Sequence, residues 1–331
     1  MNRRQALLGA AALSACGGAK GGAATPAPFP MRRGINLGNA LEAPNEGDWG
    51  YRIESAHLIA IAEAGFDGVR LPVRWDAHTD AEPPHMINSA LMQRVGDIID
   101  QCLALGLHIQ LDCHHYEALI ADPRAERARF LSIWRQIAAE FQSAPARLLF
   151  EPLNEPNGGA LDGTRLTELQ REALAVIRET NPERLVVLGP GNWQNIDALA
   201  RWTPPEGDNI AVSVHYYEPH AFTHQSAEWL GEDAPVFQRS WGERADIDAV
   251  AAHISRAADW GARRGFAVQL GEFGVNAAVP LEQRAAWTSA VREACDANSM
   301  GWCVWDFAGA FPVWNRERGA WIDELRGALA L

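Results

Sequence analysis

The chain has 331 residues, and 29 Lys and Arg against 42 Asp and Glu give it a net charge of −13. Such an acidic chain is a poor nucleic-acid partner, because tracking a phosphate backbone requires clustered Lys and Arg. A composition of 47% hydrophobic and 21% charged residues excludes wholesale disorder. Thirteen Trp against four Tyr exceed the usual need of a core, and indole faces suit stacking on ligands with apolar faces, such as sugars.

Residues 1–16 have the pattern of an export signal. A basic head at Arg3 and Arg4 precedes an apolar run over residues 6–15, and the segment ends in Leu-Ser-Ala-Cys at Cys16. The paired arginines resemble a twin-arginine signal, and the ending resembles a bacterial lipoprotein box, whose cysteine is lipidated after cleavage. We therefore expect export to the periplasm, to the outer membrane through a lipid anchor at Cys16, or to the medium. Residues 17–30, rich in Gly, Ala and Pro, predict a flexible linker.

From residue 34 onward, short apolar runs alternate with amphipathic segments of helical period. The runs predict strands at residues 34–39, 68–73, 108–114, 148–154, 184–189, 210–216, 267–272 and 302–307. The intervening segments predict helices at residues 55–64, 91–105, 130–141, 166–180, 247–264 and 281–296. This α/β alternation indicates a parallel sheet covered by helices, which closes into a single (β/α)8 TIM barrel over residues 31–331. The alternative is an open doubly wound sheet, but the first strand lacks its G-x-G-x-x-G phosphate turn.

Beyond the signal, the cysteines are Cys102, Cys113, Cys295 and Cys303. Their spacings fit no metal-ligand pattern, and a chain of this size needs no disulfide framework. We interpret them as buried thiols and leave one disulfide open. Beyond residue 30 we find no apolar run of 18 residues, so we expect no membrane span.

Polar and aromatic side chains gather where the predicted strands end, which is the catalytic edge of such a barrel. Two of them, Glu155 and Glu272, are carboxylates from different strands. Cleavage of a glycosidic bond needs such a pair, because one acid protonates the leaving oxygen while the other attacks, or activates water at, the anomeric carbon. A separation of about 5 to 5.5 Å would indicate a retaining mechanism, and about 6.5 to 9.5 Å an inverting one.

Several segments occur in a telling order along the chain: residues 33–42 (RGINLGNALE), 69–72 (VRLP), 154–156 (NEP), 215–217 (HYY), 271–274 (GEFG) and Trp305. Together they resemble glycoside hydrolase family 5. The resemblance runs over about residues 31–330 and is greatest to bacterial endo-β-1,4-glucanases, including a branch that also cleaves mannans. The NEP triplet alone is shared by related barrel families, so the order of the matched positions carries the assignment.

The resemblance implies roles for individual residues. Glu155 matches the family's acid/base and Glu272 its nucleophile, which Arg70 and Tyr217 would hold ionised. A nearby guanidinium does lower a carboxyl pKa, whereas the acid needs a raised one to keep its proton. Asn154 would bond the sugar 2-hydroxyl. The remaining matches are His114 and His215, the two active-site histidines, and Trp305, the platform under the sugar whose bond is cut.

We expect a further group of residues to contact the substrate: Asn39, Glu42, His115, Trp193, Trp229 and Asp306. Residues 222–229 resemble the glucan and mannan branch, where this segment shapes the leaving-side subsites. Asp306 departs from that branch, which has a glutamate after the platform tryptophan. Trp134, Trp260 and Trp287 fall within predicted helices, where packing against the barrel is the default.

The sequence thus predicts a monomeric, retaining endo-β-1,4-glucanase that acts on β-1,4-linked polysaccharides or oligosaccharides without a cofactor or a metal. One alternative is an endo-β-1,4-mannanase, or a mixed glucan, mannan and xyloglucan hydrolase. Another is a glycan-binding surface lipoprotein without catalysis, which should have lost a carboxylate or Arg70. A metal-dependent hydrolase would use His114, His115 and Glu117, or His215, His220 and His224. It is disfavoured because the first strand does not end in two His one residue apart.

Overall fold

The computed structural model describes residues 27–161 and 163–331. The predicted signal at residues 1–16, with Cys16, and residues 17–26 of the predicted linker lie outside the described residues. Parallel strands close into a barrel in sequence order: β1 (Arg33–Asn36), β2 (Gly68–Leu71), β3 (His108–Asp112), β4 (Leu148–Glu151), β5 (Val186–Leu188), β6 (Ile210–Tyr216), β7 (Ala267–Phe273) and β8 (Gly301–Val304). The predicted TIM barrel is confirmed.

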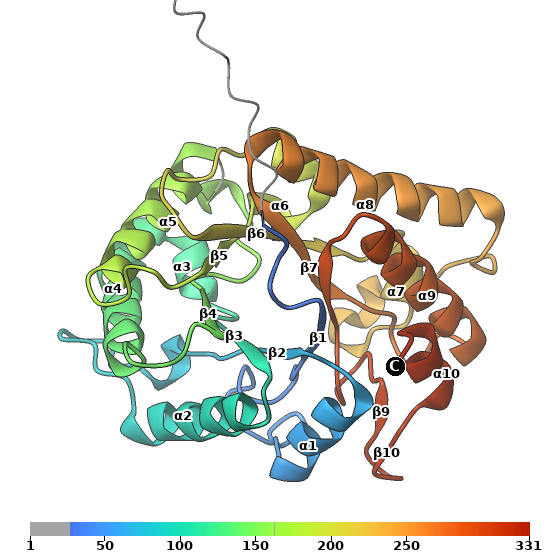
Figure 1. Cartoon of the computed structure of the whole chain (residues 1–331), viewed down its shortest axis with the longest axis horizontal. Helices are drawn as coiled ribbons and strands as arrows, with labels where there is room; N and C mark the ends of the chain where they lie inside the picture. Colours follow the sequence, from blue (N-terminus) through green and yellow to red (C-terminus); the bar gives the residue numbers. More distant parts are fainter. Residues whose placement is uncertain (1–26, 162) are drawn as a thin grey trace, which may run out of the picture.

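Helices form an outer ring around these strands (Figure 1). The ring consists of α1 (Ser55–Ala64), α2 (Ser89–Ala104), α4 (Pro123–Glu140), α5 (Gly163–Arg178), α8 (Arg244–Arg264) and α9 (Leu281–Ala297), with α10 (Asp323–Ala328) near the C-terminus. The short helices α3 (Glu117–Ala121), α6 (Gly191–Gln194) and α7 (His220–Thr223) lie in the connections after β3, β5 and β6. Short 3₁₀ helices lie at Asp76–His78, Gly159–Leu161, Ile196–Ala200 and Glu228–Asp233. A two-stranded hairpin, β9 (Trp314–Asn315) with β10 (Ala320–Trp321), follows the barrel. Within the described residues, no helix has the length and apolar character needed to cross a membrane.

The predicted strands overlap the observed ones, but most observed strands end earlier. The residues after them leave the sheet and turn into the loops that carry the polar side chains. Helix α4 starts seven residues before its predicted bound, at Pro123, because the Asp122 carboxylate caps its first turn by accepting from the N–H groups of Arg124 and Ala125. The Arg- and Glu-rich turns that follow have no apolar face for a periodicity argument to detect. No long helix follows β5: α6 and the 3₁₀ helix Ile196–Ala200 stand in its place.

The strand-start end of the barrel is closed by apolar side chains. Phe29 and Met31 enter from the N-terminal side and are fully buried. They pack with interior side chains of four strands: Leu149, Val187, Ala211 and Cys303. The four cysteines beyond the signal are buried free thiols, and Trp134, Trp260 and Trp287 are buried in the helical layer, as predicted.

At the other end, the pairing of β6 with β7 is irregular. The register shifts between Val214 and His215, after which His215 lies opposite Glu272. A second shift occurs between Leu270 and Phe273, where β7 pairs with β8. Such irregularities re-aim side chains, and they concentrate near active sites. Here they bring a histidine and a carboxylate together at the mouth of the barrel.

Candidate active site

Arg70 of β2 lies at the centre of the barrel mouth, fully buried. Its guanidinium forms ion pairs of 2.7 Å with Asp112, Glu151 and Glu272. It also donates hydrogen bonds to the side-chain oxygens of Asn36, at 3.0 Å, and Asn154, at 2.7 Å. A buried guanidinium is stable only when its N–H donors are paired. The five partners of Arg70 come from β1, β3, β4, the loop after β4, and β7. Arg70 therefore fixes the relative positions of these strand ends.

Glu272 of β7 receives three polar contacts. Arg70 Nη1 donates to its Oε1, and the Tyr217 hydroxyl donates to its Oε2 at 2.9 Å. His215 Nδ1 lies 3.5 Å from the same Oε2. These contacts orient the carboxylate and favour its ionised form.

Glu155 follows β4 in the left-handed backbone region, with φ of 44°. Its Oε1 lies 2.8 Å from His215 Nδ1, and its side chain is about a quarter exposed at 26%, against 5% for Glu272. Burial lowers the pKa of His215, so the ring is neutral near pH 7. Because its Nε2 has no hydrogen-bond partner within the described part of the chain, the ring proton belongs on Nδ1, between the two carboxyl groups.

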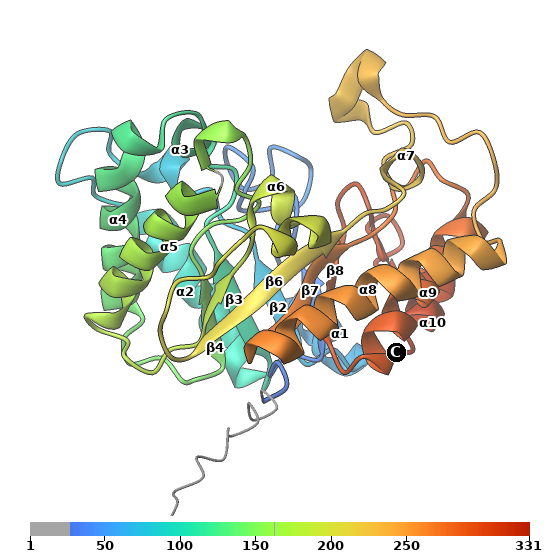
Figure 2. The ribbon, with the colours of Figure 1, turned by 90° about the horizontal axis from the view of Figure 1, so that it is seen from above.

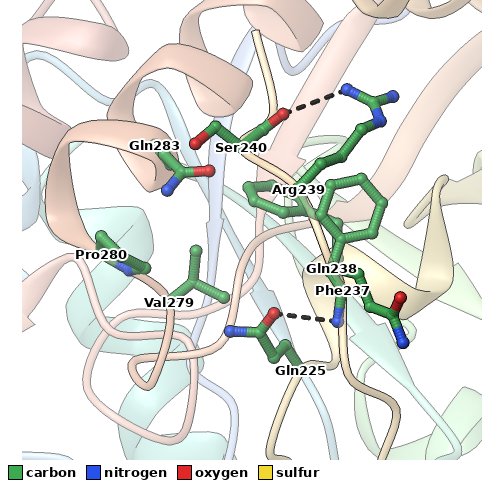
Figure 3. A pocket seen from close by; sticks show the side chains of 9 residues that line it. Gln225, Phe237, Gln238, Arg239, Ser240, Val279, Pro280 and Gln283 are labelled. Carbon is green, nitrogen blue, oxygen red and sulfur yellow. Dashed lines mark hydrogen bonds between the residues drawn. The ribbon is translucent and has the colours of Figure 1, made fainter.

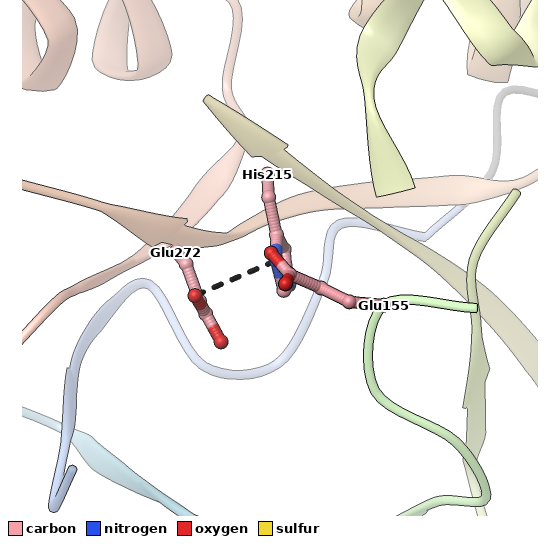
Figure 4. A group of neighbouring side chains, drawn as sticks. All are labelled: Glu155, His215 and Glu272. Atoms are coloured by element: carbon pink, nitrogen blue, oxygen red, sulfur yellow. Dashed lines mark hydrogen bonds and ion pairs between the residues drawn. The ribbon is translucent and has the colours of Figure 1, made fainter. Parts of the chain in front are cut away.

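Glu155, His215 and Glu272 form one compact cluster (Figure 4). One ligand-type atom of each residue lies within 4.8 Å of those of the other two. This short approach of the two carboxyl groups favours the retaining arrangement, with a separation of about 5 to 5.5 Å, over the wider inverting one of about 6.5 to 9.5 Å.

Burial raises the pKa of both carboxyl groups to about 7. The sequence led us to expect a lowered pKa for Glu272. His215, Arg70 and the Tyr217 hydroxyl do act in that direction, but burial and the neighbouring Glu155 outweigh them. The two groups titrate as a pair. Glu272 holds the contact with the guanidinium, so it is the member that loses its proton first, while Glu155 keeps its own.

A second relay connects the asparagine before Glu155 with the predicted platform. Asn154 Nδ2 donates to His114 Nε2 at 3.2 Å, and His114 Nδ1 lies 3.1 Å from Asp112 Oδ2. Burial holds the pKa of His114 well below its ordinary value, so the ring is neutral, with its proton toward Asp112. The Trp305 indole stacks parallel to this ring, with centroids 5.6 Å apart and planes inclined by 5°.

The predicted substrate-contact residues divide into two groups. Trp193 and Trp229 are 54% and 56% exposed, and Trp49 is 42% exposed beside His115, whose ring contacts both Trp49 and His114. Trp229 and His224 pack against Phe311, and His224 also contacts Tyr217. These exposed aromatic faces are available for stacking on a ligand.

Asn39, Glu42 and Asp306 form the second group. The Glu42 carboxylate is fully buried and accepts from the backbone N–H groups of Asn39 and Ala40. Asp306 is also fully buried and accepts from the N–H of Gly309. Asn39 itself is only half-buried. Glu42 and Asp306 therefore shape the turns around the mouth and expose no atom to a ligand in this structure.

Sequence reasoning missed Glu151 and Gln194. Glu151 contacts Arg70 through both carboxylate oxygens and accepts from Gln110 at 2.7 Å. Gln194 is fully buried, and its Oε1 accepts from the N–H of Glu155. A charged residue inside an otherwise apolar strand run, as in Leu-Leu-Phe-Glu, was the available signal for Glu151. For Gln194 the sequence gives no comparable signal, because a glutamine in a loop is ordinarily exposed.

The two metal-ligand sets that the sequence offered do not assemble in residues 27–161 and 163–331, where only Glu155, His215 and Glu272 cluster closely enough to ligate an ion. His220 and His224 stack ring on ring, with centroids 4.0 Å apart. The Arg70 guanidinium already supplies positive charge to Glu272 at 2.7 Å. The carboxylates are therefore compensated by the chain itself.

A separate hollow of about 290 Å³ lies beside the segment between β6 and α8 (Figure 3). Its walls are Phe222, Gln225, Phe237, Gln238, Arg239, Ser240, Val279, Pro280 and Gln283. Gln225 Oε1 accepts from the N–H of Phe237 and ties the two ends of this segment together. None of the predicted catalytic side chains lines this hollow.

The chain is similar to known proteins in both sequence and structure. The family model described as Cellulase (glycosyl hydrolase family 5) matches residues 32–310. Endoglucanase H of Acetivibrio thermocellus is 33% identical over 313 residues, which cover 91% of this chain but only 33% of that protein. Endoglucanase A of Ruminococcus albus is 29% identical, with 89% of this chain and 88% of that protein covered. The chain thus spans about a third of the first relative and most of the second.

Solved structures give the same picture. Thermotoga maritima Cel5A in complex with cellobiose has a TM-score of 0.88 and 38% identity, covering 90% of this chain and 97% of that one. The same protein with mannotriose has the same TM-score, identity and coverage.

Proposed function

Because the chain belongs to glycosyl hydrolase family 5, we propose that it is an endo-β-1,4-glucanase that hydrolyses internal β-1,4 bonds of glucans with retention. The observation that carries this proposal is the pair of carboxyl groups, Glu155 and Glu272, whose oxygens approach within 4.8 Å. Of these two carboxyl groups, only that of Glu272 contacts the Arg70 guanidinium. Two acids with unlike surroundings can perform unlike tasks in one reaction.

In this mechanism Glu155 protonates the glycosidic oxygen while ionised Glu272 attacks the anomeric carbon. A covalent glycosyl-enzyme forms and the leaving sugar departs with the proton. Glu155, now a carboxylate, takes a proton from the incoming water, which displaces Glu272 and returns the sugar with its original anomeric configuration. The chemistry needs no cofactor or metal.

The surrounding side chains support these two roles. Arg70 and Tyr217 orient Glu272 and stabilise its charge, and the Nδ1–H of neutral His215 can donate a hydrogen bond to either carboxylate as the charges change. Asn154, which Arg70 and His114 hold by hydrogen bonds, bonds the sugar 2-hydroxyl in this mechanism. Trp305, stacked on His114, is the platform for the sugar whose bond is cut.

The test is the anomer released from a cello-oligosaccharide, followed by proton NMR before mutarotation. We expect the β-anomer first from the native chain. Glu272→Gln, which keeps the shape of the side chain, should fold normally and lose at least about 10⁴-fold in turnover, because it removes the nucleophile. First release of the α-anomer, or near-normal turnover by Glu272→Gln, would refute the proposal.

A second candidate is hydrolysis of mannan, or of glucan and mannan alike. It is favoured by one observation: a structural neighbour with 38% identity has been solved with mannotriose. Reducing-sugar release from carboxymethylcellulose, barley glucan, glucomannan and galactomannan, measured side by side, separates the two candidates. Activity on galactomannan at or above that on barley glucan would favour the mannanase. Binding of all four without product would instead favour a non-catalytic glycan-binding protein.

We also propose that the chain is exported and anchored through Cys16, with residues 17–30 as a tether and residues 31–331 as one monomeric catalytic domain. Phe29 and Met31 pack at the strand-start end of the barrel, opposite the loops that carry the site. An anchor reached from that end leaves the mouth facing away from the membrane and open to a polymer. Cys16→Ser should shift the protein from the membrane fraction to the aqueous fraction. An unchanged distribution would refute the anchor.

A further inference from the structure

Gln194 lies at the point where the loop after β5 meets the loop after β4. It is the last residue of α6, a turn at the strand-end face of the barrel (Figure 2). Asn192, Trp193 and Gln194 all adopt left-handed backbone conformations, with φ of 56°, 56° and 52°. Three successive residues without a glycine in this region are unfavourable locally, so the surrounding contacts must hold them there. The turn exposes Trp193 on the surface and sends Gln194 inward, where it is fully buried.

The Gln194 side-chain amide connects the main chain of Glu155 with the network of Glu151, Arg70 and Glu272. Its Oε1 accepts from the main-chain N–H of Glu155 at 2.7 Å. Its Nε2 donates to Glu151 Oε1 at 3.3 Å and to the Ser213 carbonyl at 3.4 Å. Glu151 in turn binds Arg70, which binds Glu272. A continuous series of buried polar contacts therefore runs from the main chain of Glu155 to the carboxylate of Glu272.

The space for this side chain is specific. A Cβ on Gly189, at the end of β5, would lie 2.3 to 2.6 Å from Nε2, Cγ and Cδ of Gln194, so the glycine leaves a cradle that the amide fills. A second clamp, from the N–H of Trp193 to the Pro156 carbonyl at 3.2 Å, holds the same two loops together. Only a side chain that both accepts and donates satisfies the Glu155 N–H and the Glu151 carboxylate at once.

We propose that Gln194 is a positioning residue for Glu155: it holds the main chain of the acid/base against the Arg70 network, and so sets where the acid meets the leaving oxygen. The inference rests on the proposed function, because it concerns the proton-transfer step of that reaction. Glu155 itself is in the left-handed region, with φ of 44°, and its N–H bond to Gln194 fixes that conformation. Losing this bond would let the carboxyl group move without removing it.

The experiment compares two substrates that differ in their need for an acid. The sugar that leaves a cello-oligosaccharide is a poor leaving group and must be protonated. Dinitrophenyl β-cellobioside releases dinitrophenolate, which leaves without protonation. For Gln194→Met, which keeps the length of the side chain but neither hydrogen bond, kcat/KM on the oligosaccharide should fall by about 10 to 100-fold with KM nearly unchanged. On the dinitrophenyl substrate it should fall less than about threefold, because bond cleavage there does not depend on the acid.

Two further variants isolate the contact. Gly189→Ala should displace Gln194 from the opposite side and give the same dependence on the leaving group. Gln170→Met is the matched control: Gln170 is another buried amide of this region, which donates to the Gly189 carbonyl at 2.7 Å and accepts from Trp202, but touches neither Glu155 nor the Arg70 network. The Gln170→Met variant should lower kcat/KM on both substrates by the same factor or leave both values unchanged. A structural defect alone would move stability without separating the two substrates.

Glu155→Ala is measured in parallel, with and without azide. If kcat/KM of this variant falls equally on both substrates and azide does not restore turnover, the acid/base role of Glu155 is refuted, and with it the proposed function. If it does discriminate between the substrates while Gln194→Met and Gly189→Ala do not, the inference about Gln194 alone is overturned. Failure of both variants to fold would also overturn it, in favour of a purely structural role.

Discussion

At the end where the strands begin, the barrel interior is filled by Phe29, Met31 and their apolar neighbours, whereas at the end where the strands finish it encloses Arg70 and three carboxylates. Between them lies a polar layer, in which Gln269 donates to Gln110 at 2.8 Å and Gln110 donates to Glu151. The same eight strands thus enclose two different clusters. The apolar cluster of Phe29, Met31, Leu149, Val187, Ala211 and Cys303 is called the plug, and the end that holds the charged cluster around Arg70 is called the mouth.

The two ends contribute differently to stability. Burial of apolar side chains at the plug stabilises the fold by about 25 cal/mol per Å². At the mouth, one guanidinium faces Asp112, Glu151 and Glu272, and burying ions costs stability unless they are well paired. Burial raises the pKa of Asp112 to about 8 against the opposing effect of Arg70, whereas at Glu151 the effect of Arg70 prevails over burial and the pKa is lowered. The mouth is therefore built for chemistry and the plug for folding, and substitutions at the two ends should separate these properties.

Arg70→Met should have the largest effect on both properties. It leaves buried carboxylates without their cation, so we expect a loss of about 3 to 5 kcal/mol in the free energy of unfolding and at least a 10²-fold loss of kcat/KM. Urea unfolding and hydrolysis of barley glucan measure the two. Arg127→Met is the matched control, since Arg127 pairs with Glu172 on the surface and is 52% exposed. It should change stability by less than about 1 kcal/mol. A midpoint for Arg70→Met as high as that of the native chain would contradict the comparison.

Met31→Ala should affect stability alone. The Met31 side chain fills the space that Gly34 and Gly68 leave at the starts of β1 and β2, where a Cβ would approach its sulfur to 3.1 and 2.2 Å. Emptying this space should cost about 2 to 5 kcal/mol, whereas Met31→Leu should cost less than about 1.5 kcal/mol. When kcat/KM is measured at a temperature well below the midpoint of thermal unfolding, so that both variants are folded, both should have the kcat/KM of the native chain. A specific loss of activity in Met31→Ala would show that the plug also positions the mouth.

The contrast between the two ends explains how far the sequence could lead. The strands, the six long helices and the family resemblance followed from apolar periodicity and from motifs that stand at strand ends. Two of the three ion-pair partners of Arg70, Asp112 and Glu151, did not, because which side chains meet inside a barrel depends on the register of neighbouring strands. Gln194 was missed for a related reason: Gly189, Pro190 and Gly191 announce a turn, but not that the turn is left-handed and sends this side chain inward.

Glu42 and Asp306 show the converse limit. Their position beside matched motifs predicted contact with substrate, but both carboxylates are buried, and backbone N–H groups of tight turns bond both oxygens of Glu42 and one oxygen of Asp306. Burial raises the pKa of Glu42 to about 8 and that of Asp306 to about 7. A sequence shows that a polar residue stands near a site, but not whether it faces the ligand or the loop that carries it.

The dependence of activity on pH gives the finest separation of the two ends. The reaction needs Glu272 ionised and Glu155 protonated, and the pKa of each is raised to about 7 by burial. As pH falls below this value Glu272 gains a proton and loses its nucleophilicity, and as pH rises above it Glu155 loses the proton it must donate. The profile of kcat/KM should therefore be bell-shaped with its maximum near pH 7. On dinitrophenyl β-cellobioside, whose cleavage does not depend on the acid, the native chain and Glu155→Gln should both show only the acid limb that Glu272 produces. Met31→Ala should leave both limbs in place, because no titrating group of the mouth contacts the plug. A maximum below about pH 5, or a shift of either limb in Met31→Ala, would mean that the carboxyl pair is better solvated, or more closely coupled to the plug, than the packing of the two ends indicates.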